Sequence, residues 1–88
     1  MDIIKPASAG TMESSDVYVE IEPADNLRID VESVVLAQFG DAIRSAVQDV
    51  LQQQGVEKAA VRLTDRGALE CVIRARVETA IIRGRENG

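Results

Sequence analysis

Two short runs with an aliphatic side chain at every second position stand close together near the start of the chain. They cover residues 17–22 and 27–32. A period of two is typical of a β-strand with one buried face. The four residues between the runs, Pro-Ala-Asp-Asn at 23–26, are turn formers. The pattern therefore predicts a β-hairpin.

A longer segment with helical periodicity follows the hairpin. We expect Ser33 to be the N-cap and the helix to run to about Gln54, with Gly55 as its stop signal. Its apolar residues recur at spacings of three and four and form one stripe: Val35, Leu36, Phe39, Ile43, Val47, Val50 and Leu51. Residues 59–64 alternate again and predict a third strand, which a turn at 65–67 closes.

The segment 68–85 fits two secondary structures. Its apolar residues alternate well enough for a strand over 69–77, yet they also form a helical stripe, and Glu70 and Arg74 are a favourable pair four residues apart. We expect a helix, with a hairpin at 66–67 followed by a shorter helix as the alternative. Cys71 lies in the apolar run and is expected to be buried. The predicted fold is α+β, a small three-stranded sheet (the β-hairpin plus one further strand) packed against two helices.

Length and composition restrict the class of protein. The 88 residues predict a single domain, 1–88, with one modest core and a flexible N-terminal arm over residues 1–10. A net charge of -5 and only two aromatic residues argue against nucleic acid as a partner. No apolar run approaches a membrane span, no signal peptide is evident and the one cysteine gives no internal disulfide, so we expect a cytoplasmic protein without membrane association.

The absence of histidine narrows the chemistry further. Without it the chain offers no Ser-His or Cys-His pair and no histidine-based metal site, so we expect no catalytic residue and no metal. Ser14 and Ser15 lie in a predicted loop before the first strand, where serines commonly form turns or face solvent. A loop hydroxyl without a neighbouring base can also be modified by another enzyme, which would make it an attachment point.

The sequence resembles one carrier family in four blocks that occur in order. The blocks are Ala-Gly-Thr-Met-Glu-Ser-Ser-Asp at 9–16, Gln-Phe-Gly at 38–40, Asp-Arg-Gly-Ala-Leu-Glu-Cys at 65–71 and Arg-Ala-Arg-Val-Glu at 74–78. With them the chain resembles the acyl carrier protein of citrate lyase, the gamma subunit, over residues 7–83. Met12 and Arg66 stand where the family commonly has leucine and lysine.

This resemblance implies a carrier role and not an enzyme on its own. It implies that Ser14 is linked through a phosphodiester to 2'-(5''-phosphoribosyl)-3'-dephospho-CoA, whose thiol carries acetyl and citryl thioesters. It also implies three partners: the alpha subunit that exchanges acetyl for citrate, the beta subunit that cleaves the citryl thioester to oxaloacetate, and a transferase that attaches the group. The preference for Ser14 over Ser15 rests on the resemblance alone.

Other residues near the serine have open interpretations. Gly10 is expected to leave room for the arm and the transferase, and Glu13 and Asp16 to pair with basic groups of a docking enzyme or to be solvated. Arg74 and Arg76 are expected to be solvated or salt-bridged, with contact to the arm's phosphates as the less favoured alternative. For the whole chain the alternatives are the carrier of a related decarboxylase complex and a non-enzymatic interaction or regulatory domain with an open sheet.

Overall fold

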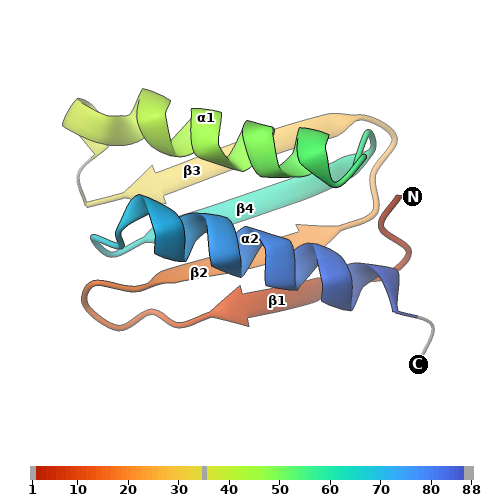
Figure 1. Cartoon of the computed structure of the whole chain (residues 1–88), viewed down its shortest axis with the longest axis horizontal. Coiled ribbons are helices and arrows are strands. Elements are labelled where there is room, and N and C mark those ends of the chain that lie inside the picture. Colours follow the sequence, from red (N-terminus) through yellow and green to blue (C-terminus); the bar gives the residue numbers. More distant parts are fainter. Residues whose placement is uncertain (1, 35, 87–88) are drawn as a thin grey trace.

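The computed structural model (Figure 1) describes residues 2–34 and 36–86, and of residues 36–39 the backbone alone. Within these residues lie four strands and two helices. In chain order they are β1 (Ala7–Gly10), β2 (Val17–Glu22), β3 (Leu27–Ser33), α1 (Leu36–Gln53), β4 (Ala59–Asp65) and α2 (Glu70–Arg85). The α+β class and the two helices are confirmed, whereas the predicted three-stranded sheet is wrong by one strand.

The predicted hairpin of residues 17–22 and 27–32 is also wrong, because β4 lies between its two strands. The sheet order is β1-β2-β4-β3, with β4 antiparallel to β2 and parallel to β3. The connection over residues 23–26 therefore spans two strand spacings, roughly 10 Å, which four residues cover easily. The Ala59 N–H donates to the Asn26 carbonyl at 3.1 Å and fastens this connection to the start of β4.

Burial explains why β4 takes the central place. Ala59, Val61 and Leu63 on its inner face are at most 1 % exposed, whereas Ile29 and Val31 of β3 are only half-buried. A strand with strands on both sides removes more apolar surface from solvent than an edge strand does. The two strands with fully buried inner faces, β2 and β4, accordingly hold the inner positions, and the less buried β3 lies at an edge. The helix α1 then connects the parallel strands β3 and β4, as such a pairing requires.

The fourth strand comes from the predicted N-terminal arm. Ala7–Gly10 forms β1 and pairs with β2, with Ala9 opposite Val19. Before it, Ile3 is 4 % exposed, and the Ile4 N–H donates to the Gly84 carbonyl at 2.9 Å. Residues 3–10 thus belong to the packed structure and are not a loose arm. Small side chains in β1 gave no alternating apolar pattern from which the strand could be predicted.

The two ends of α1 differ in how well the sequence predicted them. Ser33 is not its N-cap, because Ser33 ends β3 and its hydroxyl donates to the Asp65 carboxylate at 2.8 Å. At the other end the stop signal is confirmed. Gly55 has a φ of +71°, its N–H donates to the Gln52 carbonyl, and the Val56 N–H donates to the Leu51 carbonyl, which is the Schellman pattern.

The helix expected over 68–85 is confirmed as α2, but Cys71 is not buried. Ile73, Val77, Ala80 and Ile81 form the inner face of α2, and Cys71, two residues before this stripe begins, faces solvent in the first turn. The prediction rested on the apolar residues around Cys71, but in a helix only residues three and four apart share a face, and Cys71 lies off the buried stripe that begins at Ile73.

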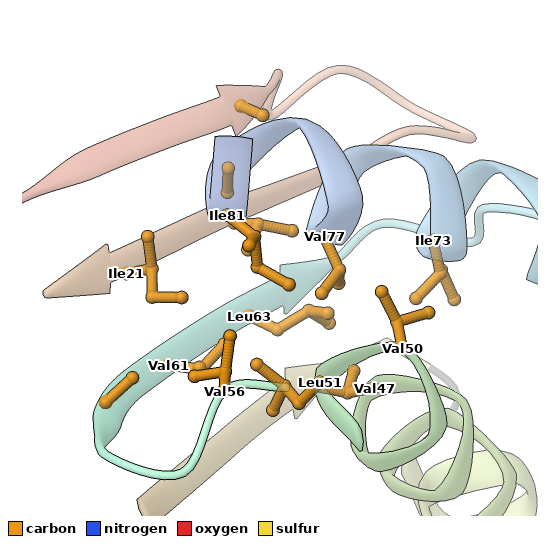
Figure 2. Close-up of a cluster of buried hydrophobic side chains, with 14 of the residues drawn as sticks. Ile21, Val47, Val50, Leu51, Val56, Val61, Leu63, Ile73, Val77 and Ile81 are labelled. Carbon is orange, nitrogen blue, oxygen red and sulfur yellow. The ribbon is translucent and has the colours of Figure 1, made fainter. Parts of the chain in front are cut away.

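Both helices cover the same face of the sheet (Figure 1). An aliphatic core lies between the two layers (Figure 2), built on the inner residues of β2 and β4, such as Ile21 and Leu63. Of the α1 stripe, Ile43, Val47, Val50 and Leu51 are buried as expected. Val35 and the side chains of Leu36 and Phe39 lie outside the described residues. No described helix has the length and apolar character that crossing a membrane requires.

The buried N-terminus can be tested with two neighbouring substitutions. Ile3→Ala removes a side chain packed against Gly84 and should lower the free energy of unfolding by about 2 kcal/mol or more. Ile4→Ala changes a side chain that is 51 % exposed and should stay within about 0.5 kcal/mol of the parent. Urea unfolding followed by circular dichroism measures both, and equal effects would contradict the packing of this segment.

Candidate functional site

Ser14 lies in the loop between β1 and β2, at the end of the sheet where β4 finishes and α2 begins (Figure 1). The Asp16 N–H donates to the Glu13 carbonyl at 3.1 Å, so Ser14 and Ser15 are the two central residues of a tight turn. Both are exposed. The Ser14 hydroxyl makes no hydrogen bond to any described residue, and this leaves its oxygen accessible to another molecule.

The backbone of Ser15 is held in an unusual conformation. Its φ is +66°, in the left-handed region that favours glycine. Its N–H donates to the Arg66 carbonyl at 2.8 Å, a contact with the connection between β4 and α2. The backbone of Ser15 is therefore held by a hydrogen bond to another part of the chain, whereas the backbone of Ser14 has no such bond to a described residue outside the turn.

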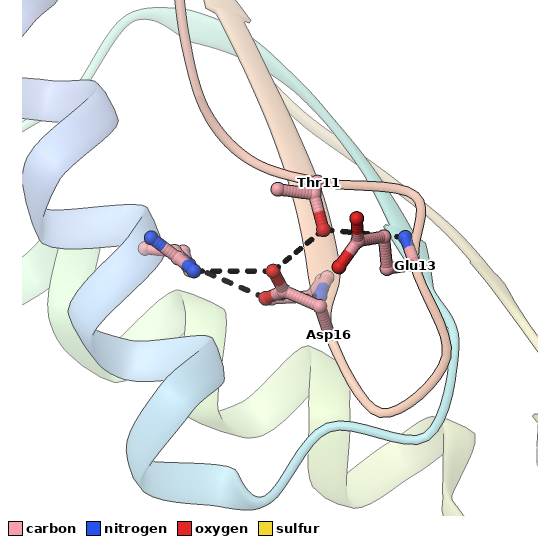
Figure 3. A network of polar contacts seen from close by, with 5 residues as sticks. Thr11, Glu13 and Asp16 are labelled. Carbon is pink, nitrogen blue, oxygen red and sulfur yellow. Dashed lines mark hydrogen bonds and ion pairs between the residues drawn. The ribbon is translucent and has the colours of Figure 1, made fainter.

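Asp16 anchors the loop through its carboxylate (Figure 3). Thr11 Oγ1 donates to Asp16 Oδ2 at 2.7 Å, and the Val17 N–H donates to Oδ1 at 2.8 Å. From α2, Arg76 donates to both oxygens, Nη2 to Oδ2 at 3.1 Å and Nε to Oδ1 at 3.3 Å. Asp16 thus joins both ends of the loop to the helix that covers them, and it does not offer a free charge to a docking enzyme.

The same bonds lower the pKa of Asp16 below its ordinary value of 3.8, the Thr11 hydroxyl contributing most. A carboxyl group whose pKa is lowered by folding stabilises the folded chain when it is ionised. This contribution is present above pH 3.8 and is lost as the pH falls through the lowered value. The loop is therefore anchored throughout the neutral range.

Thr11 closes the loop from its other end. Its N–H donates to the Val17 carbonyl at 3.1 Å, which continues the ladder of β1 and β2 by one further bond. Its hydroxyl oxygen also accepts the Glu13 N–H at 3.2 Å. Nothing in the sequence marked Thr11 as a site residue, because a threonine before a turn is common and its partner Asp16 lies five residues away.

Asp65, at the end of β4, is the one buried charged residue among those described, at 1 % exposure. Its Oδ2 accepts the Ser33 hydroxyl at 2.8 Å, and its Oδ1 accepts the Ala68 N–H at 2.9 Å. The next residue, Arg66, donates its N–H to the Asp16 carbonyl at 2.9 Å. Two consecutive residues therefore hold together the end of β3, the connection that leads to α2, and the loop over residues 11–16 that contains Ser14 (the serine loop).

The structure gives a reason for the glycine at position 10 that the sequence did not reveal. Its φ is +94°, and a Cβ placed on it would lie 1.8 Å from the Val17 carbonyl oxygen. The expectation that Gly10 leaves room for an arm or a transferase is thus not needed to explain the glycine. Its absent side chain allows β1 and β2 to approach each other at the point where the loop leaves the sheet.

Arg74 and Arg76 both form salt bridges, as the favoured interpretation expected. Arg74 Nη1 lies 2.6 Å from Asp49 Oδ2, and Arg74 Nε lies 3.1 Å from Glu70 Oε2. These two carboxylates, Asp49 first, raise the pKa of Arg74. Arg76 is held by Asp16. Among the residues that the structure describes, no group of three His, Cys, Asp or Glu side chains could hold a metal ion.

Comparison with known proteins finds a matching family model and close relatives that are named acyl carrier proteins. The model of the family described as "ACP: Malonate decarboxylase delta subunit (MdcD)" matches residues 4–84. The "Citrate lyase acyl carrier protein" of Escherichia fergusonii is 51 % identical over 88 residues, which are 98 % of this chain and 91 % of that protein. The protein of the same name from Serratia proteamaculans is 51 % identical over 90 residues and covers all of this chain and 88 % of its own length.

A solved structure gives the same fold. In the "Crystal structure of a Pseudomonas malonate decarboxylase hetero-tetramer in complex with malonate", one chain matches with a TM-score of 0.77 and 22 % identity. The match covers 94 % of this chain and 91 % of that one. At this identity the likeness concerns the fold alone.

The framework of the loop predicts different costs for two glycines of nearly equal φ. Gly67 has a φ of +96° and open space where a Cβ would stand. Gly67→Ala should therefore lower the free energy of unfolding only by the penalty of a left-handed backbone, about 1 to 2 kcal/mol. Gly10→Ala adds the clash with the Val17 carbonyl and should cost more than about 4 kcal/mol or prevent folding. Thermal and urea unfolding of both variants measure the difference. An equal loss would show that the close approach of β1 and β2 is not rigid.

Proposed function

Because this chain belongs to the family of citrate lyase acyl carrier proteins, we propose that it serves as the acyl carrier subunit of a citrate lyase. It is a carrier component and not an enzyme on its own, in keeping with the carrier proteins that it matches. The identity of about half of the residues over nearly the whole length of both chains is the observation that carries this proposal.

Ser14 is proposed as the attachment point of the prosthetic group. The supporting observations are its exposure, its place in the middle of a tight turn and a hydroxyl that no described residue engages. No described base lies within hydrogen-bonding reach of this hydroxyl, so an external transferase must activate it. A hydroxyl that is accessible but not activated suits modification by another enzyme better than catalysis by the chain itself.

The group proposed on Ser14 is 2'-(5''-phosphoribosyl)-3'-dephospho-CoA, joined through a phosphodiester. When bound, this group supplies a thiol that holds an acetyl or citryl group as a thioester. The residues of the chain hold the attachment point in a fixed position, because Asp16 and Arg66 connect the loop to α2 and to the end of β4. A tether that starts from a fixed position raises the local concentration of the acyl group at a docked partner.

The partners proposed are the alpha subunit, which exchanges acetyl for citrate, the beta subunit, which cleaves the citryl thioester, and the transferase that loads the group. The net charge of -5 supports docking on basic surfaces of these enzymes. The expected cytoplasmic location stays a prediction, as do the expectations of no nucleic acid and no membrane.

The carrier of a related decarboxylase complex is the second candidate. The description of the matching family and the fold shared with a malonate decarboxylase chain favour it. The sequence evidence for it is weaker, because that chain is 22 % identical and the citrate lyase carriers are about 50 % identical. Co-production with each set of subunits, followed by affinity purification, separates the candidates by which complex retains the chain.

The attachment site predicts opposite results for two adjacent substitutions. When the chain is co-produced with its transferase, the parent and Ser15→Ala should gain the mass of the group, and Ser14→Ala should not. Intact-mass spectrometry measures the adduct, and circular dichroism checks that each variant is folded. A Ser14→Ala chain that still carries the adduct would overturn the site, and a parent chain without an adduct would overturn the carrier role.

A further inference from the structure

Arg66 is a positively charged residue beside the serine turn, the tight turn of residues 13–16, and no acidic side chain pairs with it among the described residues. Its N–H donates to the Asp16 carbonyl and its carbonyl accepts the Ser15 N–H, so its backbone is bonded to the two residues that follow Ser14. Its side chain is exposed and makes no hydrogen bond or ion pair with residues 2–34 and 40–86 or with the backbone of 36–39. The guanidinium group is therefore free to bind a ligand near Ser14.

Most other cations of the described chain are already engaged. Arg74 and Arg76 are in salt bridges, and Arg44, Arg83 and Arg85 donate to the carbonyls of Ile29, Ser8 and Gln54. Lys5 also has an interaction partner. Releasing any of these would break an existing interaction, whereas binding through Arg66 breaks none.

The remaining cations without such contacts lie away from the serine turn. Arg28 stands near the start of β3 and Lys58 just before β4, both at the opposite end of the sheet. Arg62 is in the middle of β4, four residues or roughly 13 Å along the strand from Arg66. Arg66 is thus the one described cation that is both unengaged and adjacent to Ser14.

The distance from Arg66 to Ser14 is short enough for a direct contact. Opposite residues of an antiparallel pair lie about 5 Å apart, and Ser14 is two residues beyond Asp16, which places its Cα within roughly 9 Å of the Arg66 Cα. An arginine side chain together with a phosphate on the serine oxygen spans this distance. Guanidinium groups also match phosphate oxygens with paired hydrogen bonds.

A phosphate at Ser14 needs such a counter-charge. Glu13 precedes it in the same turn, and Asp16 is already neutralised by Arg76. We infer that Arg66 binds the phosphate group attached to Ser14 and thereby sets the direction in which the arm leaves the loop. The inference rests on the proposed function and assigns Arg66 as a positioning residue for the first phosphate of the arm.

The test uses the full chain carrying phosphoserine at position 14. The second pKa of this phosphate, ordinarily about 6, is measured by ³¹P NMR at 0.15 M salt. Arg66→Gln should raise this pKa by roughly 0.2 to 0.7 of a unit relative to the parent, because the cation that favours the dianion is removed. Arg62→Gln removes the same charge beyond a screening length and should leave the pKa unchanged. Arg66→Lys should fall between the parent and Arg66→Gln.

Arg66→Gln keeps the two backbone hydrogen bonds, and an amide spectrum like that of the parent checks that the loop is intact. Equal pKa values in the Arg66→Gln and Arg62→Gln chains would overturn the inference about Arg66. Failure of the parent to acquire an adduct from the transferase would instead overturn the proposed function, and the phosphoserine measurement does not depend on that step.

Discussion

The position of β4 between β2 and β3 is the constraint on which the rest of the structure depends. Every strand except β1 pairs with it, and its inner face supplies the centre of the core beneath both helices. Its last residue, Asp65, accepts hydrogen bonds from Ser33 at the end of β3 and from Ala68 in the connection that leads to α2. The next residue, Arg66, is bonded to the serine loop on both sides. One strand end thus organises the whole end of the molecule that presents Ser14.

This arrangement suits a carrier because it separates rigidity from reactivity. The loop is held by the Asp16 carboxylate, by Arg76 and by the backbone of Arg66. The serine that is proposed to bear the arm stands outside these bonds. In the proposed role, a partner enzyme meets a loop of constant shape beside the serine that bears the acyl group.

Local patterns predicted the elements but not their pairing. The alternation in β2 and β4 and the helical stripes of α1 and α2 depend on neighbouring residues, and all four elements form where the sequence placed them within a few residues. The order of the strands depends on which faces meet, and the short connection after β2 suited a hairpin equally well. At the site, too, local features could be predicted and contacts between distant residues could not. A loop around Ser14 followed from the sequence, whereas the Ser33–Asp65 bond joins residues 32 positions apart and left no sequence signal.

Amide hydrogen exchange on the chain without its prosthetic group tests most directly whether β4 holds the serine loop in place. If the loop is formed in advance, the N–H groups of Ser15, Asp16 and Arg66, which donate to carbonyls, should exchange at least about ten times more slowly than in a free peptide. The Ser15 and Arg66 protection should rise and fall together, because the two residues are bonded to each other. Exchange of these three amides at free-peptide rates in an otherwise protected sheet would contradict the account.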